Sequence, residues 1–97
     1  MAKMVYKWQL DDANLVELGK GVTLELPSTA QFLDFEYQNG AYCMWAEFDP
    51  SVTESKKMKF ELFGTGQPIS NDAVQWLKTI HLPHVGLVFH LYEMKVE

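Results

Sequence analysis

Apolar and polar residues alternate along most of this chain, with the period of two that is typical of β-strands buried on one side. This alternation predicts six strands, within residues 5–10, 22–26, 31–38, 41–48, 58–62 and 86–96. In the first of them, Tyr6, Trp8 and Leu10 share one face. The last strand is apolar on both faces, which favours a central position in a sheet or a face covered by a partner.

The dipeptide Asn39-Gly40 predicts a two-residue hairpin turn, because both central residues of a type I′ turn need positive φ. Folding about this turn sets the register of the flanking strands. The core face then holds six residues, Leu33, Phe35 and Tyr37 opposite Ala46, Met44 and Tyr42. The opposite face is acidic but carries Trp45 across from Asp34.

Three segments interrupt the alternation. Residues 11–20 are polar and predict a loop, and residues 51–57 predict a second, charged loop. Ser70 and the two polar residues after it are typical of a helix start, and the apolar spacing that follows predicts one short amphipathic helix over residues 72–80. Together these elements predict a single α+β domain over residues 1–97, mostly β, built as a compact antiparallel β-sandwich or barrel.

The amino-acid composition argues against several classes of function, beginning with the binding of nucleic-acid polymers. The net charge is −5, from 13 acidic and 8 basic residues, and every basic residue is lysine. Without the bidentate contacts of arginine, an acidic domain is a poor candidate for binding DNA or RNA polymers. No apolar run is long enough to span a membrane, and the N-terminus lacks the long apolar stretch of a secretory signal peptide, so we expect a cytosolic protein. The single Cys43 agrees with a reducing compartment.

The loop Gly64-Thr65-Gly66-Gln67-Pro68 is the sharpest candidate for a ligand contact. Glycines let a ligand approach the backbone, and successive N–H groups can form a nest for an anion. Here the nest would lead to the N-terminus of the expected helix, which also favours negative charge. The alternative is an ordinary connection between elements. Lys59 and its neighbouring lysines are either a phosphate contact or charges that protect a sheet edge.

Trp45 and His90 are further candidates, each with a structural alternative. An exposed Trp45 would suit a flat ligand or a partner, whereas a covered one belongs to a second layer of core. His90 is either a buried imidazole or a pocket residue. A thiol pair of Cys43 and His90 lacks any activating neighbour in the sequence, and the histidines lack metal-ligand spacing. We therefore expect no catalytic residue, no metal and no cofactor.

A resemblance adds to this picture. Asn39-Gly40, the run Met44–Pro50, the segment Phe60–Pro68 and the closing run Leu87–Glu93 occur here in order. This order resembles a family of small bacteriophage proteins with an NG…LWA..DP hairpin, a GTG.P loop and an LVFH.(F/Y)E last strand. The resemblance covers most of the chain after Leu24 and implies a phage origin, hence the cytosol of a host cell.

A phage origin suggests a function in countering host defence. Sponge proteins, which are similar to this chain in size, trap cyclic oligonucleotides or ADP-ribose-type signals between identical subunits. The first hypothesis is therefore a non-enzymatic homo-oligomer that sequesters a small nucleotide. Its expected ligand-binding residues are Trp45, Lys59, Gly64, Thr65, Gly66, Gln67 and His90. The alternative is a protein-interaction module that inhibits or adapts a host or phage protein, or a minor virion component.

Overall fold

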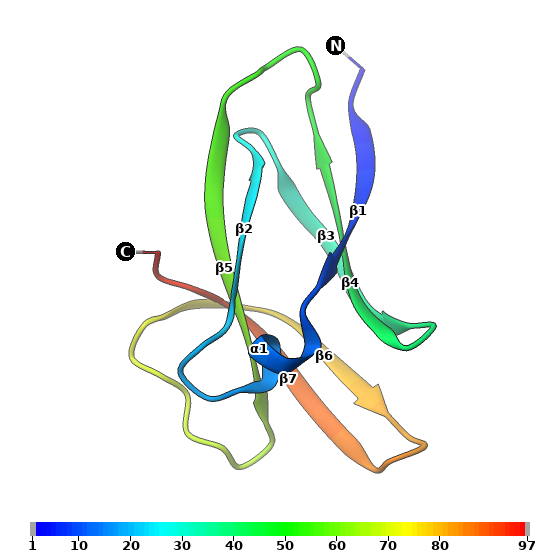
Figure 1. Ribbon diagram of the computed structural model, residues 1–97, viewed down its shortest axis with the longest axis vertical. Coiled ribbons are helices and arrows are strands. Elements are labelled where there is room, and N and C mark those ends of the chain that lie inside the picture. The colour runs from blue at the N-terminus through cyan, green and yellow to red at the C-terminus, as the bar shows by residue number, and fades with distance from the viewer. Residues whose placement is uncertain (1, 97) are drawn as a thin grey trace.

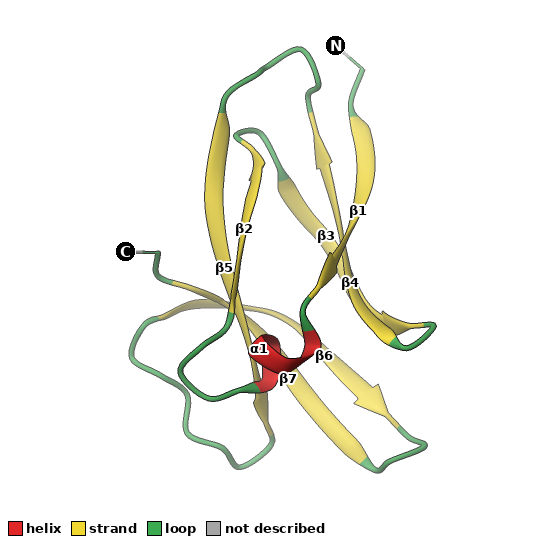
Figure 2. Cartoon of the chain, viewed as in Figure 1, coloured by secondary structure: helices red, strands yellow, loops and turns green. Residues whose placement is uncertain are grey.

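The computed structural model describes residues 2–96, which form seven β-strands and one short helix (Figure 1). Their bounds are β1 Met4–Leu10, α1 Asp12–Val16, β2 Val22–Pro27, β3 Gln31–Gln38, β4 Ala41–Phe48, β5 Ser55–Gly64, β6 Ala73–Leu82 and β7 Leu87–Met94. Strands make up most of the chain (Figure 2), so the mostly β prediction is confirmed, with one strand more than expected. None of the helices within residues 2–96 is long and apolar enough to cross a membrane.

The strands form two antiparallel sheets, of order β1-β4-β3 and β2-β5-β7-β6. Strand β7 lies between β5 and β6, which confirms the central position that its two apolar faces predicted. No ladder joins one sheet to the other within the described residues, so the structure is not a closed barrel. The core lies between the sheets, and its fully buried members include Leu10, Phe35, Met44, Phe60, Leu62 and Leu91.

The hairpin of β3 and β4 turns at the predicted dipeptide. Asn39 and Gly40 have φ of 53° and 82°, as a type I′ turn requires. Asp34 pairs with Trp45 as predicted, but the register shifts at Leu33, which is an extra residue in a β-bulge. The core position that we predicted for Leu33 is therefore wrong. Its side chain is 47% exposed, and Phe32 takes its place opposite Ala46.

The segment predicted as a helix over residues 72–80 is strand β6. Two bulges, at Val74 and Leu77, each insert one extra residue. They stretch the spacing of apolar residues from two toward three or four, which imitates a helix. The cap-like Ser70 instead makes a turn, with its hydroxyl accepting from the Asp72 N–H at 3.1 Å and its carbonyl accepting from the Ala73 N–H.

The true helix is α1, inside the segment that we predicted as a loop. Asp11 caps it, because its carboxylate accepts from the Ala13 N–H at 3.0 Å, and Leu15 anchors it with a fully buried side chain. A five-residue helix is too short for its periodicity to stand out in the sequence. The predicted loop over residues 51–57 is also shorter than expected, since β5 begins at Ser55.

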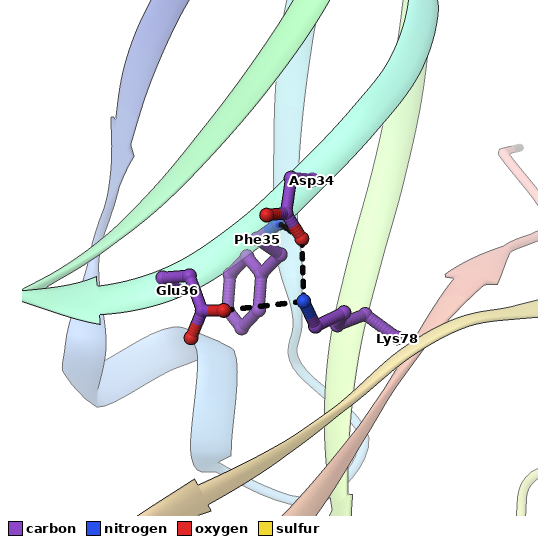
Figure 3. A network of polar contacts seen from close by, with 4 residues as sticks. All are labelled: Asp34, Phe35, Glu36 and Lys78. Carbon is purple, nitrogen blue, oxygen red and sulfur yellow. Dashed lines mark hydrogen bonds and ion pairs between the residues drawn. The ribbon is translucent and has the colours of Figure 1, made fainter.

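Lys78 joins the two sheets where the edges of β3 and β6 meet (Figure 3). Its ammonium group lies 2.6 Å from a carboxylate oxygen of Asp34 and 3.1 Å from one of Glu36. The hydrogen bond from Lys78 lowers the pKa of Asp34, and the bonds to the two carboxylates raise the pKa of Lys78. All three side chains are partly exposed, so we expect the network to contribute about 1 kcal/mol rather than the larger energy of a buried ion pair.

Replacing Lys78 by methionine should lower the free energy of unfolding by about 1 kcal/mol at neutral pH. Because the pKa of Asp34 is lowered in the folded state, this contribution exists above the ordinary carboxyl pKa of about 4 and disappears as the pH falls through the lowered value. Urea titrations of both proteins from pH 7 toward pH 2 should therefore converge. Lys20→Met, which removes an exposed pair with Glu17, is the matched control. A difference that persists in acid would contradict the assignment.

Gly21 fits closely against the sheet at the start of β2. Its φ is +67°, and a Cβ there would lie 2.6 Å from the carbonyl oxygen of Phe60. Gly19 also has a positive φ, of +84°, but a Cβ there would meet nothing within 4 Å. Alanine at Gly19 would introduce backbone strain alone, whereas alanine at Gly21 would introduce backbone strain and a steric clash. Comparing the two substitutions therefore separates these two costs.

Gly19→Ala should lower the free energy of unfolding by about 1 kcal/mol, the cost of the backbone strain alone. Gly21→Ala should lower it by about 3 kcal/mol or more, because the methyl group must also displace the β5 backbone. Thermal and urea unfolding of the two variants measures the difference. Equal losses would mean that β2 does not lie as close to Phe60 as the structure places it.

Candidate functional site

A partly apolar groove lies between β1 and β2. Strand β1 pairs only with β4, and β2 pairs only with β5, so each has one free edge within residues 2–96. The groove lies between these strands and is lined also by residues of the β4–β5 link. Figure 1 shows this link crossing between the two sheets at one end of the molecule. The volume of the groove is about 420 Å³. It is therefore an opening between the sheets rather than a dent in one of them.

One wall of this groove is aromatic. Tyr6, Trp8 and Phe48 form a cluster in which the Tyr6 and Phe48 rings meet edge to face at 5.0 Å, and the Trp8 ring lies 6.0 Å from Tyr6. Tyr6 and Trp8 lie on the inward face of β1, opposite the buried residues Ala46 and Met44. Yet Tyr6 is 50% exposed, because the opposite sheet does not cover this end of the strand.

The opposite wall comes from β2 and the β4–β5 link. Leu26 and Pro27 extend the apolar lining, and Glu25 and Glu54 add two carboxylates. The Glu25 carboxylate accepts from the hydroxyl of Ser55 at 2.7 Å. No lysine or histidine lines the groove. Its chemistry is thus aromatic and acidic, which suits apolar and cationic groups and disfavours phosphates.

The predicted loop residues and His90 do come together, at the other end of the molecule. Thr65 and His90 share a hydrogen bond of 2.9 Å between Oγ1 and Nε2, beside a hollow of about 330 Å³ lined in part by Gly64 and Thr65. Gly66 has a φ of +88°. However, the Gly64 N–H donates to the Gln67 side chain, and the Gln67 N–H donates to the Gly64 carbonyl. Two N–H groups of the expected anion nest are therefore already used within the loop.

Trp45 and Lys59 lie apart from this cluster. Trp45 is partly buried in the three-stranded sheet, between Lys7 on β1 and Asp34 on β3. Lys59 is five residues before Gly64 on the same extended strand, about 16 Å away along β5. It lines a separate hollow together with Lys57. The structure thus brings together five of the seven residues expected to bind a ligand.

His90 belongs to a hydrogen-bond network that the sequence did not reveal. Its Nδ1 lies 2.9 Å from the hydroxyl oxygen of Thr79. The same hydroxyl oxygen accepts a hydrogen bond from the indole N–H of Trp76 at 3.1 Å. A neutral imidazole has one donor and one acceptor nitrogen. Of the two threonines, Thr65 and Thr79, one therefore donates its hydroxyl hydrogen to the ring and the other accepts a hydrogen bond from it. These cross-strand partners depend on β6 being a strand, which the expected helix concealed.

Other chemistry finds little support in the part of the chain that the structure describes. Cys43 is buried on β4, and its thiol contacts only the Ala41 carbonyl, at 3.9 Å. No group of three His, Cys, Asp or Glu residues within 2–96 gathers closely enough to hold a metal ion. The groove, in contrast, was missed because the alternation of Tyr6 and Trp8 predicts a core face and does not say whether a second sheet covers it.

Comparison with known proteins gives a family but no activity. No curated protein and no solved structure matches the chain significantly. A family model described as Domain of unknown function (DUF7352) matches residues 1–97. Since this match spans the whole chain, the protein belongs to the DUF7352 family.

Proposed function

We propose that this protein is a non-enzymatic interaction module that holds a segment of another protein in the groove between β1 and β2. The observation that carries the proposal is the half-exposed Tyr6, which lies on the inward face of a strand and packs against Phe48 in an open groove. Aromatic side chains in such positions are the usual anchors of protein interfaces. The proposal agrees with the alternative hypothesis from the sequence, a protein that inhibits or adapts a host or phage protein.

Exposed apolar surface at this site supports the proposal further. Met4 and Tyr6 on the inward face of β1 are 40% and 50% exposed, and Val5 on the outward face is 54% exposed. Covering apolar surface is favourable by about 25 cal/mol per Å² before the entropy cost of association is subtracted, so this exposed surface favours a partner that covers it. The acidic lining argues against a nucleotide as the occupant, because Glu25 and Glu54 would repel its phosphates.

Tyr6→Asp should weaken partner binding at least about tenfold, the size of effect expected for an interface anchor. Val74→Asp is the matched control, because Val74 is a similarly exposed apolar residue on the edge strand β6, outside the groove and away from the edge of β1. Tagged wild type and both variants, produced in bacterial cells, would be compared by quantitative mass spectrometry of the proteins that they retain. A partner should stay with wild type and Val74→Asp and be lost with Tyr6→Asp.

The same partner, purified, should then bind wild type in a calorimetric titration with a defined stoichiometry. The free energy of unfolding of each variant, measured in urea, separates lost binding from lost folding. If no retained protein distinguishes Tyr6→Asp from Val74→Asp, the groove is not the interaction site and the proposal fails.

Sequestration of a small nucleotide is the second candidate, and a different observation favours it. Five of the residues expected for it lie together, and the contact of Thr65 with His90 borders a hollow. In this reading the protein acts as a homo-oligomer in the cytosol of the host of a phage, with the nucleotide between subunits. It ranks second because two loop N–H groups are already bonded and no helix N-terminus follows the loop.

Native mass spectrometry with cyclic oligonucleotides and cyclic ADP-ribose isomers tests this candidate. A discrete oligomer should gain the mass of one ligand per site, and Thr65→Val should lose that gain because it removes the hydroxyl beside His90. Lys59→Met, whose side chain lies in another hollow, should keep it. A protein that stays free of ligand across the panel would exclude this candidate and leave the groove proposal intact.

A further inference from the structure

The free edge of β1 is suited to accept another strand. It pairs with β4 over residues 4–10 without a register shift, and its other edge has no partner strand within residues 2–96. Natural sheets usually blunt such edges with bulges, proline or charged side chains, lysine above all. The other three edge strands of this fold carry these features: β3 has one bulge, β6 has two, and β2 ends in Pro27. Strand β1 has no bulge and no proline, and the ammonium group of its Lys7 reaches across β4 to Gln38 on β3, away from the free edge. Its backbone groups therefore remain available for pairing.

The charge of the groove beside β1 indicates what such a strand would carry. Glu25 and Glu54 line the groove, and no basic side chain does. Lys57 lies opposite Glu25 in the ladder of β2 and β5, but no ion pair joins them, and the Glu25 carboxylate is bonded to Ser55 instead. Both carboxylates can therefore take a cation. The Tyr6 ring, which lines the same groove, offers a cation–π contact as well.

Building on the proposed function, we infer that the segment held in the groove is an extended peptide that adds to the free edge of β1 and places a lysine or arginine side chain among Tyr6, Glu25 and Glu54. Side chains of an added strand alternate between the two faces of the sheet. Those on the inward face enter the aromatic groove, beside Tyr6 and Trp8. Those on the outward face lie next to Val5. The partner sequence should thus alternate, with apolar and basic residues at every second position.

A second copy of this chain fits the groove less well than such a peptide. If β1 paired with itself, the inward residues of the partner copy would be the same apolar set, Met4, Tyr6 and Trp8. Glu25 and Glu54 would then stay without a cationic partner in the interface. The charge of the lining therefore favours a basic peptide from another protein.

A random-peptide library selected on the immobilised wild-type protein tests this inference. Selected peptides should be enriched in lysine or arginine flanked at every second position by apolar residues. A synthetic copy of the best peptide should bind wild type at least about tenfold more tightly than Glu54→Lys, and raised salt should weaken it. Glu17→Lys, the same charge change at an exposed glutamate outside the groove, should bind like wild type. Bound peptide should also slow amide exchange along β1.

The outcomes separate this inference from the proposed function. Peptides that lose binding with Tyr6→Asp but carry neutral or acidic residues would overturn the basic partner and leave the groove as the binding site. Peptides whose binding is the same in wild type and Tyr6→Asp would overturn both. A concentration-dependent dimer in sedimentation experiments, broken by Tyr6→Asp, would mean that the occupant is a second copy, which would also overturn the inference.

Discussion

The charged contact between the two sheets lies at one pair of strand edges, where Lys78 bonds to Asp34 and Glu36. Among the described residues, Lys78 is the only cation whose ion pairs join one sheet to the other, and it does so where β3 and β6 meet. The apolar core holds the sheets together beneath this contact. No equivalent contact joins β1 to β2. The sandwich is therefore joined along one pair of strand edges and open along the other.

The opening leaves part of the inward face of β1 uncovered, because this face extends beyond the core. Exposure falls along this face from the half-exposed Tyr6 to the fully buried Leu10, so one strand supplies both core and groove. An edge strand with uncovered aromatic residues and unpaired backbone groups is unfavourable in isolation. A partner strand would satisfy the backbone and cover the rings at once, and the nearby Glu25 and Glu54 would select its charge.

Local signals in the sequence predicted the local structure well. Asn39-Gly40 predicted the hairpin turn, and Asp34 lies opposite Trp45 as expected. Two of the errors, the core position of Leu33 and the helix over β6, arose where one extra residue changes the period, because a bulge depends on tertiary context rather than on propensity. The short helix α1 was missed for a different reason, its length of five residues. The β-branched and aromatic residues of β6 were the signal that could have corrected the helix prediction.

The candidate site was harder to predict, because it depends on strand order. Close neighbours in the sequence, Gly64 to Gln67, were correctly grouped, and His90 joined them across the sheet. Trp45 and Lys59 were placed by residue type alone and lie elsewhere. The groove escaped notice because Tyr6 and Trp8 alternate like core residues, and only the arrangement of the two sheets shows that one end is uncovered.

The most direct test of this account is residue-by-residue amide hydrogen exchange of the free protein, measured by NMR. In an antiparallel edge strand, alternate N–H groups point to the paired neighbour and to solvent. The account predicts that protection alternates along residues 4–10, with N–H groups bonded to β4 exchanging slowly and the others exchanging fast. Uniform protection along β1 would mean that its second edge is already paired, and would contradict an open groove.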